Sequence, residues 1–206
     1  GIRPKDFAGQ LCPSSSQDSP SFNLSTSYPT SHGDPFVEIG RTHYVGSIGS
    51  SVGMDDMGEG VSCPSTNLLN QSERIDGVFY RNSETKIEHI RDGSSKTIMI
   101  GERSKGWINS SRGAAGEFDS TWVGIVSGSP HTGWRVLGWT GEPPNNEPGG
   151  QTHFHGYAQF NSAHAGVTMF GFADGSVQSI GDDIDPYVFK AMGTKRGGEI
   201  ISGSDF

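Results

Sequence analysis

The chain has 206 residues and a formal net charge of −8, with 15 lysines and arginines against 23 aspartates and glutamates. Because nucleic acids and anionic membrane surfaces bind clustered cationic side chains, this balance argues against both as partners. The 31 glycines and 11 prolines favour turns and short strands over long helices, and no apolar run reaches the roughly 20 residues that cross a bilayer. One domain over residues 1–206 is expected at this length.

The first two thirds of the chain predict an extended segment, short strands and long loops. Residues 1–35 are rich in serine and proline and have few apolar positions, which indicates an extended covering segment. Val37, Ile39 and Tyr44 are the expected inward side chains of the first strands, and residues 49–70 have the composition of a loop. Short apolar stretches predict strands at residues 36–48, 77–81, 86–90, 97–102, 121–126 and 133–139.

The last quarter of the chain begins with a hairpin signal. Residues 168–173 are apolar and aromatic, an Asp-Gly-Ser turn follows, and residues 177–180 can return as the second strand. Asp-Gly favours a hairpin because the tight turn needs a positive φ angle, which glycine adopts freely and aspartate tolerates.

A short helix is predicted directly after this hairpin. Asp185 is a natural N-cap, Pro186 suits the first helical position, and Gly193 suits the C-terminal cap of a helix that ends at Met192. Hairpin and helix form one C-terminal unit over residues 160–206. The expected fold class is therefore α+β, predominantly β, with an antiparallel sheet, long loops and a short C-terminal helix.

Nine residues separate His164 from the pair Asp174 and Gly175. This stretch resembles the C-terminal signature of a large bacterial family of prepilin-like proteins, which is known by the pattern His-x9-Asp-Gly and is mostly of unknown function. Further stretches resemble the family pattern, in family order, at residues 11–14, 42–46, 76–79, 90–102 and 194–199.

The resemblance implies a pilin-like globular head without the prepilin leader and long apolar N-terminal helix with which family members typically begin. It implies a non-enzymatic structural subunit, the soluble ectodomain of a pilin-like or pseudopilin-like protein of a cell-surface filament or secretion apparatus. The expected location is extracytoplasmic, and the expected partners are further copies of the chain or other pilin-like subunits. Membrane contact would be made only through the absent helix.

The two cysteines, Cys12 and Cys63, each begin a Cys-Pro-Ser sequence. Neither lies in a Cys-x-x-Cys motif or a catalytic signature, which argues against a nucleophilic or metal-binding thiol. The extracytoplasmic setting that the resemblance implies favours a disulfide between Cys12 and Cys63.

Three histidines, His153, His155 and His164, are candidate zinc ligands, because alternating histidines share one face of a strand. No closed set of four ligands is identifiable, so the favoured interpretation is structural. His164, which belongs to the family signature, is then expected to hydrogen-bond backbone near the turn at Asp174 and Gly175 and to hold the hairpin.

Asp182, Asp183 and Asp185 form an acidic loop between the hairpin and the helix. Carboxylates in such a loop can hold Ca²⁺, which takes about 6–8 oxygen ligands. Related pseudopilins of type II secretion systems hold calcium near the C-terminal end of their sheet, so the resemblance also points to this loop. The alternative is a solvated turn with Asp185 as the helix cap, in which no cofactor is bound.

Trp122, Trp134 and Trp139 suggest an alternative function. Exposed tryptophans cover sugar rings in glycan-binding faces, so these side chains could belong to an extracytoplasmic binding module for glycan or another surface ligand. The competing interpretation is that they pack in the core or against the sheet. The sequence has no Gly-x-Ser-x-Gly elbow, paired-carboxylate motif or phosphate loop, so an enzyme is not predicted.

Overall fold

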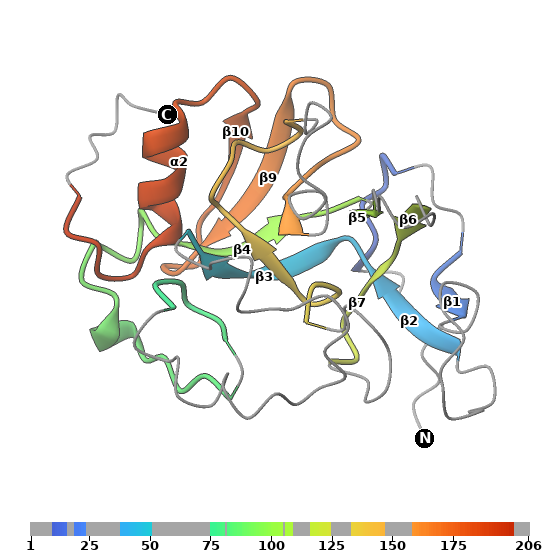
Figure 1. Ribbon diagram of the computed structural model, residues 1–206, viewed down its shortest axis with the longest axis horizontal. Coiled ribbons are helices and arrows are strands. Elements are labelled where there is room, and N and C mark those ends of the chain that lie inside the picture. The colour runs from blue at the N-terminus through green and yellow to red at the C-terminus, as the bar shows by residue number, and fades with distance from the viewer. Residues whose placement is uncertain are drawn as a thin grey trace.

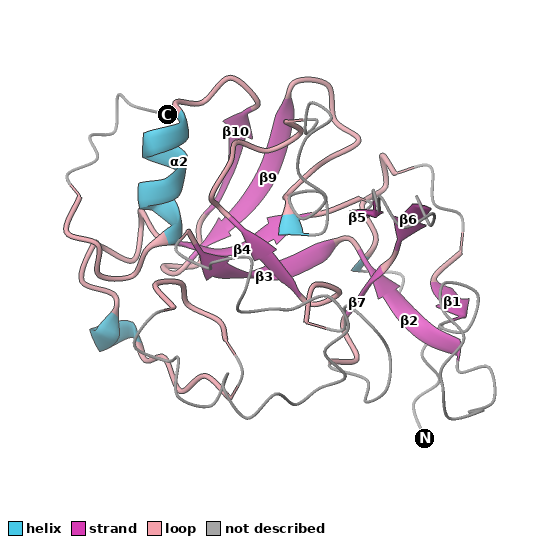
Figure 2. Cartoon of the chain, viewed as in Figure 1, coloured by secondary structure: helices cyan, strands magenta, loops and turns pink. Residues whose placement is uncertain are grey.

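The computed structural model describes residues 10–15, 19–23, 38–50, 75–80, 82–104, 106–108, 116–124, 133–146 and 158–199 (Figure 1). Most of the regular structure is β-strand, and a short helix lies near the C-terminus (Figure 2). The predicted class, α+β and predominantly β, is confirmed.

In the described part of the chain the strands form three sheets. The central sheet has the order β10 (Val177–Gly181), β9 (Val167–Phe172), β4 (Ile98–Glu102), β3 (Tyr44–Gly49) and β8 (Leu137–Trp139). A second sheet has the order β1 (Ser21–Asn23), β2 (Glu38–Thr42) and β7 (Ser120–Thr121). The third pairs β5 (Gly106–Ile108) with β6 (Gly116–Phe118). All pairs are antiparallel except β3 with β8, so the central sheet is mixed where an antiparallel sheet was predicted.

The predicted hairpin is present as β9 and β10. Gly175 has a φ angle of 88°, and the N–H and hydroxyl of Ser176 both donate to Asp174 Oδ1, at 2.8 and 2.7 Å. Phe172 and Ser176 close the loop, since the Phe172 N–H donates to the Ser176 carbonyl at 2.9 Å. Local turn chemistry therefore decides the position of this hairpin.

Helix α2 (Pro186–Gly193) packs on one face of the central sheet. Asp185 caps it as predicted, because its Oδ1 accepts the N–H groups of Tyr187 and Val188. Phe170 of β9 meets Phe160 and Phe189 edge-on, with ring centroids 5.2 and 5.5 Å apart. The buried residues of this core are Val45, Ile98, Phe160, Phe170, Phe172, Ile180, Ile184, Phe189, Ala191 and Met192.

Two predicted strands are absent, and two are shorter than predicted. Of the described part of residues 121–126 only Thr121 belongs to a strand, and of residues 133–139 only Leu137–Trp139 do. Residues 77–80 form a loop against β3, in which the Gly77 N–H donates to the Ile48 carbonyl and the Phe79 N–H to the Ser47 carbonyl. Residues 86–90 contain the short 3-10 helix η6 (Ile87–His89). In stretches this short, composition alone does not distinguish a strand from a turn.

The inward residues of the first strands are partly confirmed. Ile39 is buried, but Tyr44 is 37% exposed and the next residue, Val45, enters the core. Val37 lies outside the described residues. Within residues 1–35, β1 pairs with β2 and a turn at Cys12 contacts the end of β2. No helix in the described ranges is long and apolar enough to cross a membrane.

Candidate functional site

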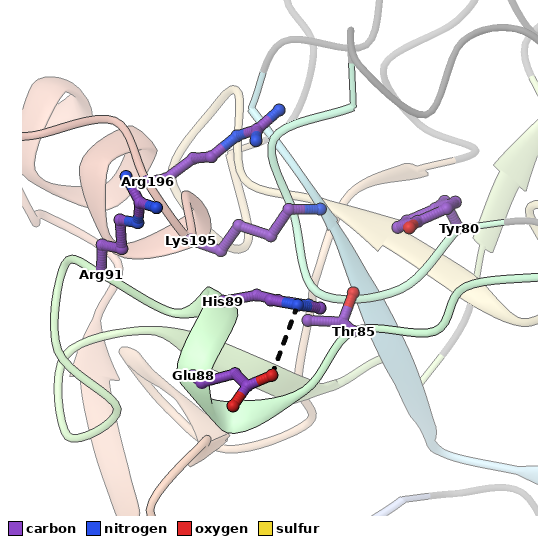
Figure 3. Close-up of a pocket in the computed structure, with 7 residues that line it drawn as sticks. All are labelled: Tyr80, Thr85, Glu88, His89, Arg91, Lys195 and Arg196. Carbon is purple, nitrogen blue, oxygen red and sulfur yellow. Dashed lines mark ion pairs between the residues drawn. The ribbon is translucent and has the colours of Figure 1, made fainter.

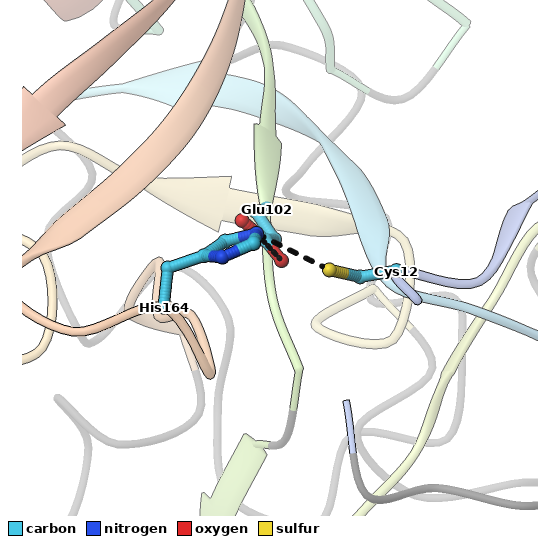
Figure 4. A group of neighbouring side chains, drawn as sticks. All are labelled: Cys12, Glu102 and His164. Atoms are coloured by element: carbon cyan, nitrogen blue, oxygen red, sulfur yellow. Dashed lines mark hydrogen bonds and ion pairs between the residues drawn. The ribbon is translucent and has the colours of Figure 1, made fainter. Parts of the chain in front are cut away.

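Three side chains from distant parts of the sequence meet beside the C-terminal end of β4. They are Cys12, Glu102 and His164, and one ligand atom of each lies within 4.8 Å of the other two. His164 Nε2 is 3.4 Å from Cys12 Sγ and 3.9 Å from Glu102 Oε1. Figure 4 shows His164 and Cys12 converging on Glu102 from different segments of the chain. This is the group of potential metal ligands that the described part of the chain contains.

Cys12 is placed by a turn and by His43. The Ser15 N–H closes the turn by donating to the Cys12 carbonyl at 3.0 Å. Pro13 is the second residue of this turn, a position that favours the fixed φ angle of proline. The Cys12 N–H donates to His43 Nδ1 at 2.9 Å. His43 also joins this turn to β4, because its carbonyl accepts the Arg103 N–H at 2.7 Å.

Glu102 is the last residue of β4 and is completely buried. Its Oε2 accepts the Ser162 hydroxyl at 2.8 Å and the Met169 N–H at 3.4 Å. Its Oε1, which faces His164, has no hydrogen-bond partner. Burying a carboxylate with an unsatisfied oxygen is costly, so this position favours a neighbouring cation.

His164 lies in the loop that leads into β9, and its side chain is 34% exposed. The backbone N–H of His164 donates to the Ser162 hydroxyl at 3.0 Å. The same hydroxyl donates to Glu102. Ser162 therefore sets the spacing between the histidine and the carboxylate.

The arrangement is not that of an activated cysteine nucleophile. Burial raises the pKa of the Cys12 thiol, and the neighbouring Glu102 carboxylate raises it further, so the reactive thiolate is disfavoured. In a nucleophilic triad the two ring nitrogens face different partners. Here His164 Nε2 alone faces both the sulfur and the carboxylate.

The prediction for His164 is wrong in its contacts. The turn at Asp174 and Gly175 lies beyond the far end of β9, whereas His164 precedes the start of that strand and its ring faces Glu102 and Cys12. Sequence proximity to the hairpin therefore did not indicate which segment the ring contacts. Asp174 and Gly175 form the turn without it.

Only one cysteine of the predicted disulfide lies in the described residues. Cys12 carries a free, buried thiol, and Cys63 lies outside the residues that the structure describes. His153 and His155 also lie outside the described residues. Cys12 contacts His164, and nothing in the local sequence of either residue suggests this contact.

The predicted calcium loop does not bring its three carboxylates together among the described residues. Asp182 Oδ1 accepts Asn145 Nδ2 at 2.8 Å, and Asp185 caps α2. Asp183 is exposed. The helix cap at Asp185 agrees with that part of the alternative given above.

None of Trp122, Trp134 and Trp139 is an exposed platform, because all three are half-buried. Trp139 Nε1 donates to the Ser50 carbonyl at 2.9 Å, and the carbonyl of Trp134 accepts Arg103 Nη1.

A second polar site is a pocket of ≈ 280 Å³. Figure 3 shows Lys195 directed toward Tyr80, with Nζ 4.7 Å from the ring centroid. Lys195 Nζ also donates to the Gly77 carbonyl at 2.7 Å, so this cation holds the loop that contains Gly77. The lining residues are Tyr80, Thr85, Glu88, His89, Arg91, Lys195 and Arg196.

Glu102 is the site residue that the sequence interpretation missed. A carboxylate that ends a buried apolar strand, residues 97–102, is the signal that could have identified it, since buried acidic residues are rare unless paired.

The model of a family described as "Protein of unknown function (DUF1559)" matches residues 5–187. No curated protein and no solved structure matches the chain.

Proposed function

Because this chain belongs to the DUF1559 family, whose function is unknown, we propose its role from its own signature and geometry. We propose that it is a non-enzymatic structural subunit, the extracytoplasmic head of a pilin-like protein in a cell-surface filament or secretion apparatus. The His-x9-Asp-Gly signature supports a pilin-like protein. One face of the central sheet supports its assembly with other subunits.

That face is the one opposite α2. A bulge at Met99 reverses the alternation along β4, so that Ile98 pairs with Phe172 on the α2 side while Ile100 pairs with Gly171 on the other. Gly171 in turn pairs with Val177 of the edge strand β10. Ile100, Gly171 and Val177 thus form one row across three strands.

This row is apolar and incompletely covered. Val177 is 68% exposed, and Ile100 and Met169 are half-buried. A Cβ built on Gly171 would meet only Ile100, at 3.9 Å, so the middle of the row is a shallow depression. A sheet face with this shape suits the apolar side of a helix, because a missing side chain lets another backbone approach closely. The occupant we propose is the apolar helix of a pilin-like subunit.

A glycan-binding module, the alternative from the sequence, is less well supported. The three tryptophans that suggested it are all half-buried, and the indole N–H of Trp139 donates to the Ser50 carbonyl.

The proposal is tested in the bacterium that encodes the chain. Surface appendages are sheared from cells that carry the wild-type chain, Val177→Lys or Ile87→Lys, and the chain is quantified in the sheared fraction. Ile87 is the matched control because it is 63% exposed but lies on η6, outside the row formed by Ile100, Gly171 and Val177. We expect the wild-type and Ile87→Lys chains in the sheared fraction and a several-fold loss for Val177→Lys. Recovery of the wild-type chain from the cytoplasm, or equal amounts for the two variants, would refute the proposal.

A further inference from the structure

We propose that Cys12, Glu102 and His164 form a binding site for Zn²⁺. This inference goes beyond the structural role proposed above and does not depend on it. It rests on the spacing of the three ligand atoms, on an unsatisfied buried oxygen, and on the contacts that hold the ligands in place.

The spacing matches tetrahedral coordination. With Zn–S of about 2.3 Å and Zn–N and Zn–O of about 2.1 Å, sulfur and nitrogen ligands lie about 3.6 Å apart, and nitrogen and oxygen about 3.4 Å apart. The corresponding distances are 3.4 Å from Cys12 Sγ to His164 Nε2 and 3.9 Å from His164 Nε2 to Glu102 Oε1. A rotation of the Glu102 carboxylate that moves Oε1 by about 0.5 Å would bring this oxygen to its ideal distance from His164 Nε2.

The unsatisfied oxygen is an independent observation. Glu102 is completely buried, and its Oε1 is the oxygen that faces His164 Nε2 and has no hydrogen-bond partner. A divalent cation between these atoms would satisfy the oxygen and neutralise the carboxylate, which hydrogen bonds to Oε2 alone do not do.

A second layer of contacts orients the ligands before any metal binds. Ser162 donates to Glu102 Oε2 and accepts the N–H of His164, and the Ser162 N–H donates to Asn145 Oδ1 at 2.9 Å. Asn145 is itself held by Asp182. Such outer contacts fix ligand orientation in metal sites and strengthen binding.

The ligand types select the ion. One thiolate, one imidazole and one carboxylate form a mixed set that Zn²⁺ accepts, whereas Ca²⁺ and Mg²⁺ require oxygen ligands alone. Three protein ligands leave the fourth tetrahedral position for water or a donor from another molecule. The partial exposure of His164 gives access from solvent. Binding replaces the thiol proton of Cys12, so one proton is released per ion.

The test uses Co²⁺ as a spectroscopic substitute for Zn²⁺ in the purified, reduced chain. We expect a thiolate-to-cobalt charge-transfer band that saturates at one equivalent and disappears when Zn²⁺ is added. Cys12→Ser should abolish the band, and Glu102→Gln and His164→Ala should each weaken Co²⁺ binding at least tenfold. His89→Ala, which changes an exposed histidine on η6, should leave binding unchanged.

Thermal melting gives a second readout, because an ion that binds only the folded state raises the Tm. Zn²⁺ should raise the Tm of the wild-type chain and of His89→Ala, but not that of His164→Ala, whose partly exposed side chain can be removed without opening the core. A wild-type chain without the cobalt band, or equal affinity in the wild-type and His164→Ala chains, would overturn the proposal. So would peptide mapping that finds Cys12 joined to Cys63 in the protein as isolated from its native compartment. Since the assay uses the isolated chain, its outcome is separate from that of the filament experiment.

Discussion

At the scale of the residue, His43 links the N-terminal turn to the central sheet. Its N–H donates to the Gln10 carbonyl, its Nδ1 accepts the Cys12 N–H, and its carbonyl accepts the Arg103 N–H. Because Nδ1 must accept, the ring has to remain neutral to keep Cys12 in place. Burial, assisted by the Arg41 guanidinium, lowers the pKa of His43 and favours that neutral form.

This pKa shift predicts a dependence of stability on pH. In the unfolded chain His43 takes up a proton near its ordinary pKa of about 6.5, whereas the folded chain takes it up only at lower pH. The unfolded state therefore binds more protons below about pH 6.5, and the free energy of unfolding falls as the solution is acidified.

Urea unfolding at about pH 7.5 and about pH 5.5 measures the effect. His43→Asn keeps an acceptor but cannot titrate, so it should lose less stability between the two values than the wild-type chain. His89→Asn is the control and should keep the wild-type difference. A wild-type difference that persists in His43→Asn would assign the dependence to other groups.

At the scale of the element, α2 shows how tertiary contact changes the meaning of a local signal. Gly193 was predicted as the C-terminal cap, but the helix includes it and Thr194 is the C-cap. A Cβ on Gly193 would lie 1.7 Å from Thr140 Oγ1. This glycine is therefore required by the close approach of the helix to the residue after β8.

Gly193→Ala should consequently destabilise the protein. In a helix without such a contact, alanine in place of glycine stabilises by about 0.5–1 kcal/mol. Here the methyl group overpacks the interface, and we expect a loss of about 1–3 kcal/mol in the free energy of unfolding. Lys190→Ala, on the exposed side of α2, should stay within about 0.5 kcal/mol of the wild type.

A double variant identifies the contact responsible. Thr140→Ala removes the atom nearest to the added methyl, so combining it with Gly193→Ala should recover part of the loss. Strictly additive effects of the two substitutions would mean that the cost arises elsewhere.

At the scale of the whole molecule, Arg103 joins segments that are far apart in sequence. It is completely buried, and its guanidinium donates to the carbonyls of Trp134, Leu137, Ala158 and Gln159. Burial lowers its pKa to about 9, which still leaves it charged at neutral pH. One side chain thus satisfies backbone groups at β8 and in the connection that leads from β8 to β9.

Arg103→Met should cost on the order of 4 kcal/mol in the free energy of unfolding, because it leaves these buried carbonyls without donors. Arg103→Lys should fall between the wild type and Arg103→Met, since an ammonium cannot reproduce the planar fork. Arg91→Met, at an exposed position, is the control. A loss for Arg103→Met no larger than that for Arg91→Met in urea unfolding would contradict this role.

The elements that were predicted correctly are those with strong local signals. The hairpin at Asp174 and Gly175, the N-cap at Asp185 and the buried strand that ends at Glu102 each follow from residues that are neighbours in sequence. The strand predicted at residues 77–80 is wrong because the backbone there hydrogen-bonds to β3, some 30 residues away along the chain, without joining the sheet.

The sequence by itself therefore determined the class of fold and the C-terminal hairpin and helix. Turn and cap preferences act over a few residues, so they can be recognised without a structure. The meeting of Cys12, Glu102 and His164, the role of Arg103 and the reason for Gly193 were decided only by the tertiary structure. Each depends on contacts between segments tens of residues apart, and no local preference specifies which distant segments will pack together.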